Sequence, residues 1–317
     1  MTVSGIDYRV THRTQYVYAA PVTLSHQRLH LTPRAVPYQQ VHSHEIVIAP
    51  ARAHRFESTD AFGNPLLSVT IESPHIELDV TAISRITVLA RHWPDAAATP
   101  RWESVRESLA YRVQWQPDDA QYEAAQYLFE SPHVRLKRDL RAYCEDCFPA
   151  GRSVLQAADA LMNKIYRDFR FDPSVTTVNT PVMTFFKQGS GVCQDFAHLM
   201  ISCLRSMGLA SRYMSGYLRT PTTVRDDELV GADASHAWVA LFVPGSGWVD
   251  LDPTNNIRPA QDHVVLGWGR DFSDVTPLRG VINVGGDQAL KVSVIVTPES
   301  STTTKSTTAA HSHTTRS

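Results

Sequence analysis

Cys193 stands at the beginning of a segment in which a thiol could act as a nucleophile. A stretch with two glycines and a serine, QGSGV at 188–192, precedes it, and apolar residues at three- and four-residue spacing follow it. This pattern predicts a helix that begins near Cys193 and ends at Gly208. The positive end of a helix and its free N–H groups stabilise both a thiolate and an oxyanion. Cys193 is therefore a candidate nucleophile, although a cysteine is more commonly a small buried apolar residue.

The other three cysteines fit structural roles. Cys203 falls within the apolar stripe of the same predicted helix. Cys144 and Cys147 form a single C-x-x-C motif with no second pair, so a zinc or redox site is the less favoured interpretation. Four cysteines in 317 residues are also too few for a disulfide scaffold.

A histidine and an aspartate at two ends of a predicted hairpin could serve this thiol. The segments HAWVALFV at 236–243 and WVDL at 248–251 read as two strands joined by a glycine-containing turn. His236 begins the first strand, and Asp252 follows the second. Because these two positions share one edge of a hairpin, the side chains should lie close together and could activate a thiol. Considered alone, His236 and Asp252 each fit a structural role better than a catalytic one. Considered together with Cys193, the two residues favour catalysis.

The register of this hairpin decides whether the two side chains share a face. A four-residue loop at 244–247 would pair Val243 with Trp248 and place Asp252 on the face opposite His236. A direct pairing of His236 with Asp252 would need a wider connection or a bulge. We therefore expect an irregular hairpin.

Composition and charge restrict the classes of partner. Hydrophobic residues make up 43% of the chain and charged residues 20%, which is typical of a globular protein. The formal net charge of −2 provides no basic excess for nucleic acid or an anionic membrane. The first residues do not resemble a secretory leader, and no apolar run reaches the length of a membrane span. We expect a cytoplasmic protein with a peptide or small-molecule partner, and neither nucleic acid nor membrane as a partner.

Four segments are predicted along the chain. Residues 1–95 show the alternation and turn signals of a sandwich-like all-β domain. Residues 96–130, with several prolines, read as a linker. Residues 131–298 combine helical stripes with later strands, so the chain as a whole is predicted to be α+β. Residues 299–317 are rich in serine and threonine and predict a disordered tail.

The residues around the three candidates resemble the core motifs of the transglutaminase-like superfamily, in the same order. Segments nearer the two ends are similar to a bacterial branch of that superfamily with an N-terminal β domain. The matching segments are GVCQDFA at 191–197, HAW at 236–238, DPT at 252–254, YRVTHRTQYVY at 8–18, DAFGN at 60–64 and GRDFSDVTP at 269–277.

This resemblance implies a papain-like core, in which a nucleophile helix packs on an antiparallel sheet after the β domain. It implies that Cys193 is the nucleophile, that His236 acts as base and then acid, and that Asp252 orients the imidazole. The implied chemistry is acyl transfer from a peptide or protein substrate, with no metal or other cofactor. Calcium serves some animal relatives, but the sequence has no EF-hand-type loop.

Several neighbouring residues compete for supporting roles. Asp195, in the first turn of the helix, reads as a structural acid. Asp250 shares a strand face with Asp252 but lacks the Asp-Pro-Thr context. Gln188 is one candidate for a second oxyanion donor, and His198 reads as a packing or hydrogen-bonding residue.

Three functions follow from these features. Hydrolysis of a peptide or amide bond is the leading prediction, because water is the most abundant acceptor. Protein-glutamine amine transfer would need an amine-binding groove that excludes water. A binding or scaffold protein that keeps the fold without catalysis is the third.

Overall fold

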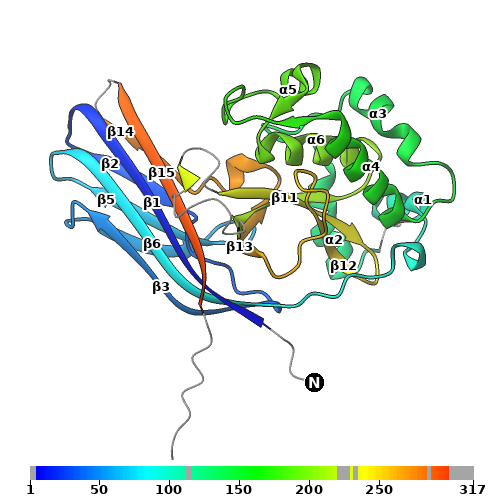
Figure 1. Cartoon of the computed structure of the whole chain (residues 1–317), viewed down its shortest axis with the longest axis horizontal. Helices are drawn as coiled ribbons and strands as arrows, with labels where there is room; N and C mark the ends of the chain where they lie inside the picture. Colours follow the sequence, from blue (N-terminus) through cyan, green and yellow to red (C-terminus); the bar gives the residue numbers. More distant parts are fainter. Residues whose placement is uncertain (1–4, 112–115, 220–228, 231–234, 284–286, 300–317) are drawn as a thin grey trace, which may run out of the picture.

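A computed structural model describes residues 5–111, 116–219, 229–230, 235–283 and 287–299 of the chain. A β-sandwich lies beside a mixed part in which helices cover a sheet, as Figure 1 shows. This architecture confirms the predicted α+β class, with an all-β part near the N-terminus.

The β-sandwich is built from two antiparallel sheets. Its longest strands, β1 (Gly5–Val22) and β6 (His75–Leu89), bury every second side chain over much of their length, because one face meets the core. The other strands are β2 (Ser25–Leu29), β3 (Gln39–Ala49), β4 (His54–Thr59), β5 (Pro65–Ile71), β10 (Leu229–Val230), β14 (Leu278–Ile282) and β15 (Gln288–Glu299). The strand orders are β10-β15-β1-β6-β3 and β14-β2-β5-β4. Apolar side chains of both sheets, Ile48 and Val69 among them, fill the space between.

The last strands of the chain return to this sandwich. β15 pairs with β1 over twelve residue pairs, and β14 pairs with β2 over five. Both strands fall largely within the segment 131–298 that the sequence analysis assigned to one core. The sandwich is thus built from both ends of the chain, and residues 300–317 lie outside the described residues.

The mixed part centres on one helix that packs on a four-stranded antiparallel sheet. The sheet order is β12-β11-β9-β13, with β9 (Ser211–Leu218), β11 (His236–Val243), β12 (Gly247–Leu251) and β13 (His263–Gly269). α6 (Cys193–Ser206) buries nearly all of its side chains against β11, β9 and the helices α3 (Arg138–Cys144), α4 (Val154–Asp168) and α5 (Val182–Gln188). The short strands β7 (Arg170–Phe171) and β8 (Ser190–Gly191) form a parallel pair beside it.

One stretch is more helical than the sequence analysis expected. The predicted linker 96–130 contains α1 (Trp102–Leu109) and α2 (Asp119–Ala125). α5 (Val182–Gln188) lies directly before the glycine-rich stretch that leads to Cys193. Its apolar residues Val182 and Phe185 are buried. Tertiary packing of such an apolar face stabilises a short helix whose residues have only a weak local preference for helix.

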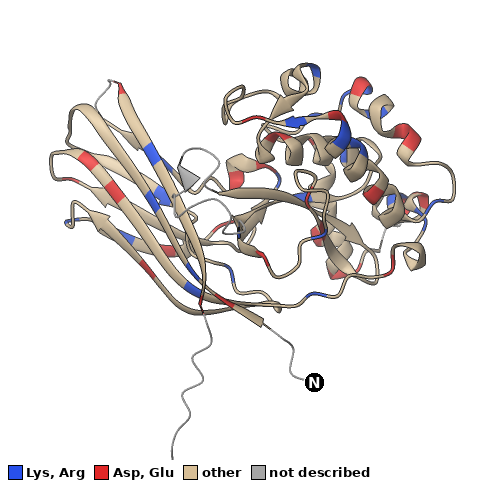
Figure 2. Ribbon diagram, viewed as in Figure 1, with Lys and Arg blue, Asp and Glu red and all other residues tan. Residues whose placement is uncertain are grey.

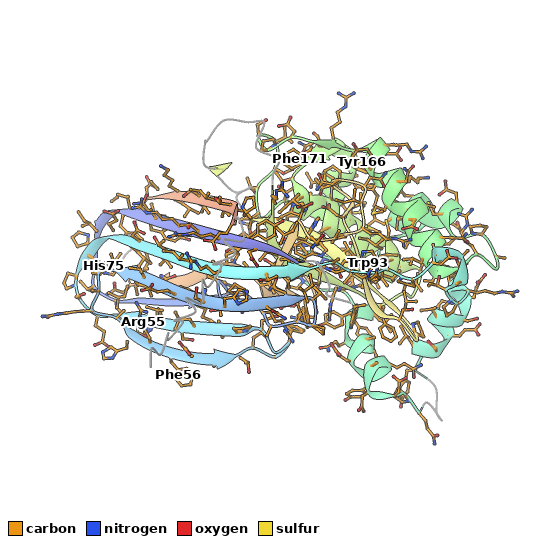
Figure 3. All side chains as sticks on the ribbon, turned by 60° about the horizontal axis from the view of Figure 1, so that its bottom comes forward. Arg55, Phe56, His75, Trp93, Tyr166 and Phe171 are labelled. Atoms are coloured by element: carbon orange, nitrogen blue, oxygen red, sulfur yellow. The ribbon has the colours of Figure 1, made fainter. Side chains whose placement is uncertain are left out.

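The two parts share an apolar interface that fixes one against the other. Tyr8 and Val10 of β1 pack with Tyr217 of β9 and with Val264 and Leu266 of β13 in one buried cluster. Trp93, in the connection after β6, lies at the junction in Figure 3 and donates a hydrogen bond to the carbonyl of Pro259 at 2.9 Å. This packing holds the five-stranded sheet against β9 and β13 of the four-stranded sheet.

Acidic and basic residues are interspersed over both parts, as Figure 2 shows. Among the described residues, no helix has the length and apolar character needed to span a membrane.

Candidate active site

Cys193 is the first residue of α6, as its sequence setting predicted. The helix start is capped by Asp195, whose Oδ2 accepts hydrogen bonds from the backbone N–H of Val192 at 2.9 Å and from Thr176 Oγ1 at 2.8 Å. Gly191 permits this approach, since a Cβ there would lie 2.5 Å from Asp195 Oδ2. Asp195 therefore has the structural role that the sequence analysis favoured, and the thiol stands at the positive end of the helix.

The hairpin that carries His236 and Asp252 is regular, so the predicted irregularity is wrong. β11 and β12 pair without a bulge, with Val243 opposite Gly247 and Val239 opposite Leu251. The loop is one residue shorter than expected, and a one-residue change of register moves a side chain to the other face. This register directs Asp252 to the face of His236.

His236 lies between the other two candidates. Its Nε2 is 2.8 Å from Oδ2 of Asp252, and its ring lines the same cavity as Cys193, which contributes to the raised pKa of the imidazole. The Cys193 Sγ also lies 3.9 Å from the carbonyl oxygen of Ser235. Asp252 is fully buried, and its Oδ1 accepts from the backbone N–H of Thr254 at 3.0 Å. The structure thus brings the three predicted residues together.

Electrostatics make the His236–Asp252 pair ionic. Burial opposes protonation of His236, but the carboxylate of Asp252 and the nearby Cys193 favour it and raise the pKa of His236 to about 10. Burial also opposes ionisation of Asp252, but His236 and His263 hold the pKa of its carboxyl well below its usual range. At neutral pH the site therefore holds an imidazolium beside a carboxylate, and an imidazolium stabilises a neighbouring thiolate.

His263 is a site residue that the sequence analysis did not identify. It begins β13, and its Nε2 lies 3.1 Å from the same Oδ2 of Asp252. Its ring also meets Trp238 edge to face, with 5.2 Å between centroids. A histidine at a strand start carries no local signal of such a role, because the contact depends on how β13 pairs with β9.

The competing residues have other partners. Asp250 binds Arg91 Nη1 at 2.6 Å and accepts from Trp238 Nε1 at 3.0 Å, so it is a buried structural acid. Gln188 donates to the carbonyl of Val175 at 3.3 Å. His198 is buried against Tyr213 and accepts a hydrogen bond from the backbone of Phe272.

The three remaining cysteines lie in the core. Cys144, Cys147 and Cys203 are buried and free of disulfides. Burial raises the pKa of the Cys203 thiol well above its ordinary value, and that of Cys147 to about 11. Low thiolate content and burial both disfavour reaction at Cys147 and Cys203.

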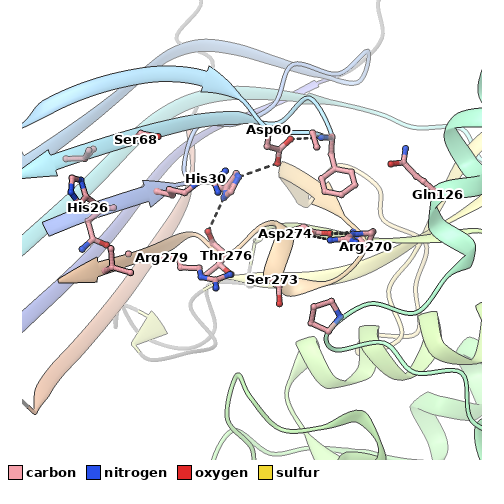
Figure 4. Close-up of a pocket in the computed structure, with 18 of the residues that line it drawn as sticks. His26, His30, Asp60, Ser68, Gln126, Arg270, Ser273, Asp274, Thr276 and Arg279 are labelled. Carbon is pink, nitrogen blue, oxygen red and sulfur yellow. Dashed lines mark hydrogen bonds and ion pairs between the residues drawn. The ribbon is translucent and has the colours of Figure 1, made fainter. Parts of the chain in front are cut away.

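Two cavities flank the segment from Phe272 to Leu278. The smaller one, about 250 Å³, is lined by Cys193 and His236 and is the candidate active-site cavity. The larger one, about 1230 Å³, lies beside strands β2 and β5 and is shown in Figure 4 with Asp60, Arg270 and Arg279 among its lining residues. The larger cavity does not include the thiol, so size alone does not identify the reactive site.

His236, Asp252 and His263 are also close enough to serve as metal ligands, with their donor atoms within 4.8 Å of one another. Both imidazole Nε2 atoms are directed at one carboxylate oxygen at hydrogen-bonding distance. Hydrogen bonds therefore account for this cluster without an ion.

Comparison with known proteins identifies the family. The profile described as a bacterial transglutaminase-like N-terminal region matches residues 8–87, and that of the transglutaminase-like superfamily matches residues 141–253. An uncharacterized protein of Mycobacterium tuberculosis is 36% identical over 299 residues, covering 92% of both chains. A protein-glutamine gamma-glutamyltransferase of Pseudomonas aeruginosa is 29% identical over 108 residues, covering 32% of this chain and 16% of that protein.

A solved structure from Cytophaga hutchinsonii, described as a candidate cysteine protease, has the same fold. It aligns with a TM-score of 0.71 at 16% identity and covers 93% of this chain and 91% of its own. Likeness at this identity concerns the fold alone. The matched profiles and the long mycobacterial relative show that this chain belongs to the transglutaminase-like superfamily and carries its bacterial N-terminal region.

Proposed function

We propose that the chain is a thiol-dependent enzyme that transfers acyl groups from peptide or carboxamide bonds, with Cys193, His236 and Asp252 as its catalytic triad. One observation carries this proposal: His236 hydrogen-bonds the buried Asp252, and its ring lines the same cavity as the thiol of Cys193. A nucleophile, a base and an orienting acid in that order are the general requirement for an activated thiol. Membership of the superfamily supports the same class of chemistry.

In the proposed reaction, the Cys193 thiolate attacks the carbonyl carbon and a C–S bond forms. The oxygen, now negatively charged, is stabilised by backbone N–H groups at the start of α6. His236 donates its proton to the nitrogen, the C–N bond breaks, and the amine leaves. An acyl thioester on Cys193 remains.

Water then resolves the thioester. His236, now neutral, takes a proton from the water as its oxygen attacks the carbonyl carbon. The C–S bond breaks, and the acid is released with the thiolate and imidazolium restored. We infer hydrolysis as the main outcome because water is the most abundant acceptor, and peptide or protein as the substrate class.

Amine transfer is the second candidate function. The relative from Pseudomonas aeruginosa is named a protein-glutamine gamma-glutamyltransferase, and the similarity covers part of this chain. In that reaction an amine, rather than water, attacks the same thioester. The two functions therefore differ only in the second step.

A partition experiment separates these functions. The full-length protein is incubated with benzyloxycarbonyl-Gln-Gly and a labelled primary amine. The two products of the second step are measured, namely the free acid benzyloxycarbonyl-Glu-Gly and the amine adduct. We expect more free acid than adduct; the reverse result would favour the transferase.

The matched variants are Cys193→Ser and Cys147→Ser, of which only the first should abolish turnover. A fully active Cys193→Ser protein would contradict the assigned nucleophile. Folded wild-type protein with no turnover of this or any peptide amide, and with an unreactive Cys193, would favour a binding protein.

A further inference from the structure

One wall of the active-site cavity comes from the β-sandwich rather than from the mixed part, which carries Cys193 and His236. Thr14 and Tyr16 of β1 and Leu290 and Val292 of β15 line the same cavity as Cys193. These strands belong to opposite ends of the chain and meet only through sheet pairing. The sandwich therefore supplies part of the surface that a substrate meets.

The pairing of β1 with β15 makes these four side chains one patch. Tyr16 lies directly opposite Leu290, and Thr14 directly opposite Val292. Directly opposed residues of antiparallel strands project on the same face, with Cβ atoms about 5 Å apart. We call Thr14, Tyr16, Leu290 and Val292 the β1–β15 wall.

The residues that line the cavity are uncharged apart from the reacting groups Cys193 and His236. Among the described residues that line it, none is Asp, Glu, Lys or Arg. His12 also lines it, but burial lowers the pKa of His12 to about 4, so this ring is neutral near pH 7. The larger cavity of Figure 4 differs, because Arg28, Arg270, Arg279, Asp60 and Asp274 all line it.

The size of the cavity restricts what it can hold. Its volume of about 250 Å³ lies just below the range of about 300–1,000 Å³ for drug-sized ligands. It can therefore hold one large side chain beside the reacting bond rather than a long segment of peptide. A charged side chain placed there would lose its hydration without a partner of opposite charge.

We propose that the β1–β15 wall forms a specificity pocket that selects an uncharged, apolar side chain next to the bond attacked by Cys193. The proposal rests on the acyl-transfer function and adds its substrate class. It also assigns a role to the N-terminal sandwich.

The test replaces Leu290, which is 56% exposed and can accept a polar substitute without loss of the core. The probes are N-acetyl-Phe, N-acetyl-Glu and N-acetyl-Lys chloromethyl ketones, whose chloride is displaced by the Cys193 thiolate. Rates of thioether formation at Cys193 are measured by intact-protein and peptide mass spectrometry. Iodoacetamide, which has no side chain to be selected, serves as the reference reagent.

We expect the wild-type protein to react with the Phe probe at least about tenfold faster than with the Glu or Lys probe, a typical discrimination for an apolar pocket. Leu290→Lys should slow the Phe probe about tenfold and raise the Glu:Phe rate ratio. Leu290→Glu should raise the Lys:Phe ratio instead. The matched control is Ile295→Lys on the same strand, where the side chain projects to the opposite face and the ratios should not change.

The outcomes distinguish the pocket from the catalytic proposal. If iodoacetamide labels Cys193 but both Leu290 variants keep the wild-type ratios, the specificity pocket is wrong and the thiol enzyme stands. If iodoacetamide does not label Cys193 in the folded wild-type protein, the proposed function itself fails. Equal changes in Ile295→Lys would mean a general charge effect and would also overturn the pocket.

Discussion

His263 Nε2 lies 3.1 Å from Oδ2 of Asp252, the oxygen that His236 reaches at 2.8 Å from the other side. Burial lowers the pKa of His263, so its ring is neutral and donates its single N–H to the carboxylate. The other nitrogen, Nδ1, is buried and has no hydrogen-bond partner among the described residues. The structure therefore points to His263 as a positioning residue for Asp252.

Replacing His263 by Phe should disturb catalysis through Asp252. The lost hydrogen bond to a charged group should lower the free energy of unfolding by about 1.5–3 kcal/mol. Because Asp252 would be less well fixed, kcat should fall while KM changes little. His263→Gln, which keeps a donor near the same position, should recover much of kcat.

A suitable control for this variant is His75→Phe. His75 is also buried with an unpaired Nε2, but it lies in the sandwich beside Tyr18. Its replacement should change the unfolding free energy and leave kcat unaltered. If His263→Phe also affects stability alone, the positioning role is excluded.

The charge of Asp252 should set the alkaline limit of activity. A pKa of about 10 for His236 predicts that kcat/KM falls only as the pH rises toward 10, when the imidazolium loses its proton. In Asp252→Asn the favourable charge is lost while burial remains, so the pKa of His236 should fall by about 1–3 units. The alkaline limb of the pH–kcat/KM profile should move to lower pH by the same amount; an unmoved limb would exclude His236 as the titrating group.

The same shift predicts a stability change with a defined sign. The folded-state pKa of His236 lies above its unfolded value of about 6.5, so its contribution is complete below pH 6.5 and is lost as the pH rises toward 10. Between pH 7 and 9.5, Tm should therefore fall more steeply in the wild-type protein than in His236→Gln. Parallel Tm curves for the two proteins would contradict the raised pKa.

Alkylation should distinguish the four cysteines. Cys193 lines a cavity at the start of a helix, whereas Cys203 is fully buried and burial raises its pKa. Iodoacetamide near neutral pH should therefore modify Cys193 well before Cys203, as read by peptide mass spectrometry. Cys193→Ser should remove the fast phase; faster labelling of Cys203 would show that the thiol at the helix start is not activated.

Gly216 should be required for the strand pairing that positions His236. It lies opposite His236, and a Cβ there would meet the Val264 carbonyl oxygen at 1.9 Å and the Trp238 ring at 2.7 Å. Gly216→Ala should destabilise the protein by about 1–3 kcal/mol or more, the usual effect of overpacking. In Gly245→Ala, where a Cβ meets open space and only the positive φ is strained, urea denaturation should show a smaller loss, of about 1 kcal/mol.

The sequence by itself determined the three candidate reactive residues and the type of element that carries each of them. The glycine-rich approach and apolar spacing around Cys193 predict a buried helix start, and α6 begins at that residue. Apolar runs on both sides of a glycine-containing turn predict β11 and β12, and their order along the chain predicts that His236 and Asp252 share an edge. These features depend on local periodicity and turn chemistry, which a single sequence contains.

Only the tertiary structure decided the relations between distant segments. The register with Val243 opposite Gly247, and hence the face of Asp252, follows from a loop one residue shorter than the sequence suggested. The contact of His263 with Asp252 depends on the pairing of β13 with β9, and the β1–β15 wall depends on strands more than 270 residues apart. Such contacts are fixed by the burial of apolar faces across the whole molecule, a property that no local pattern along the chain encodes.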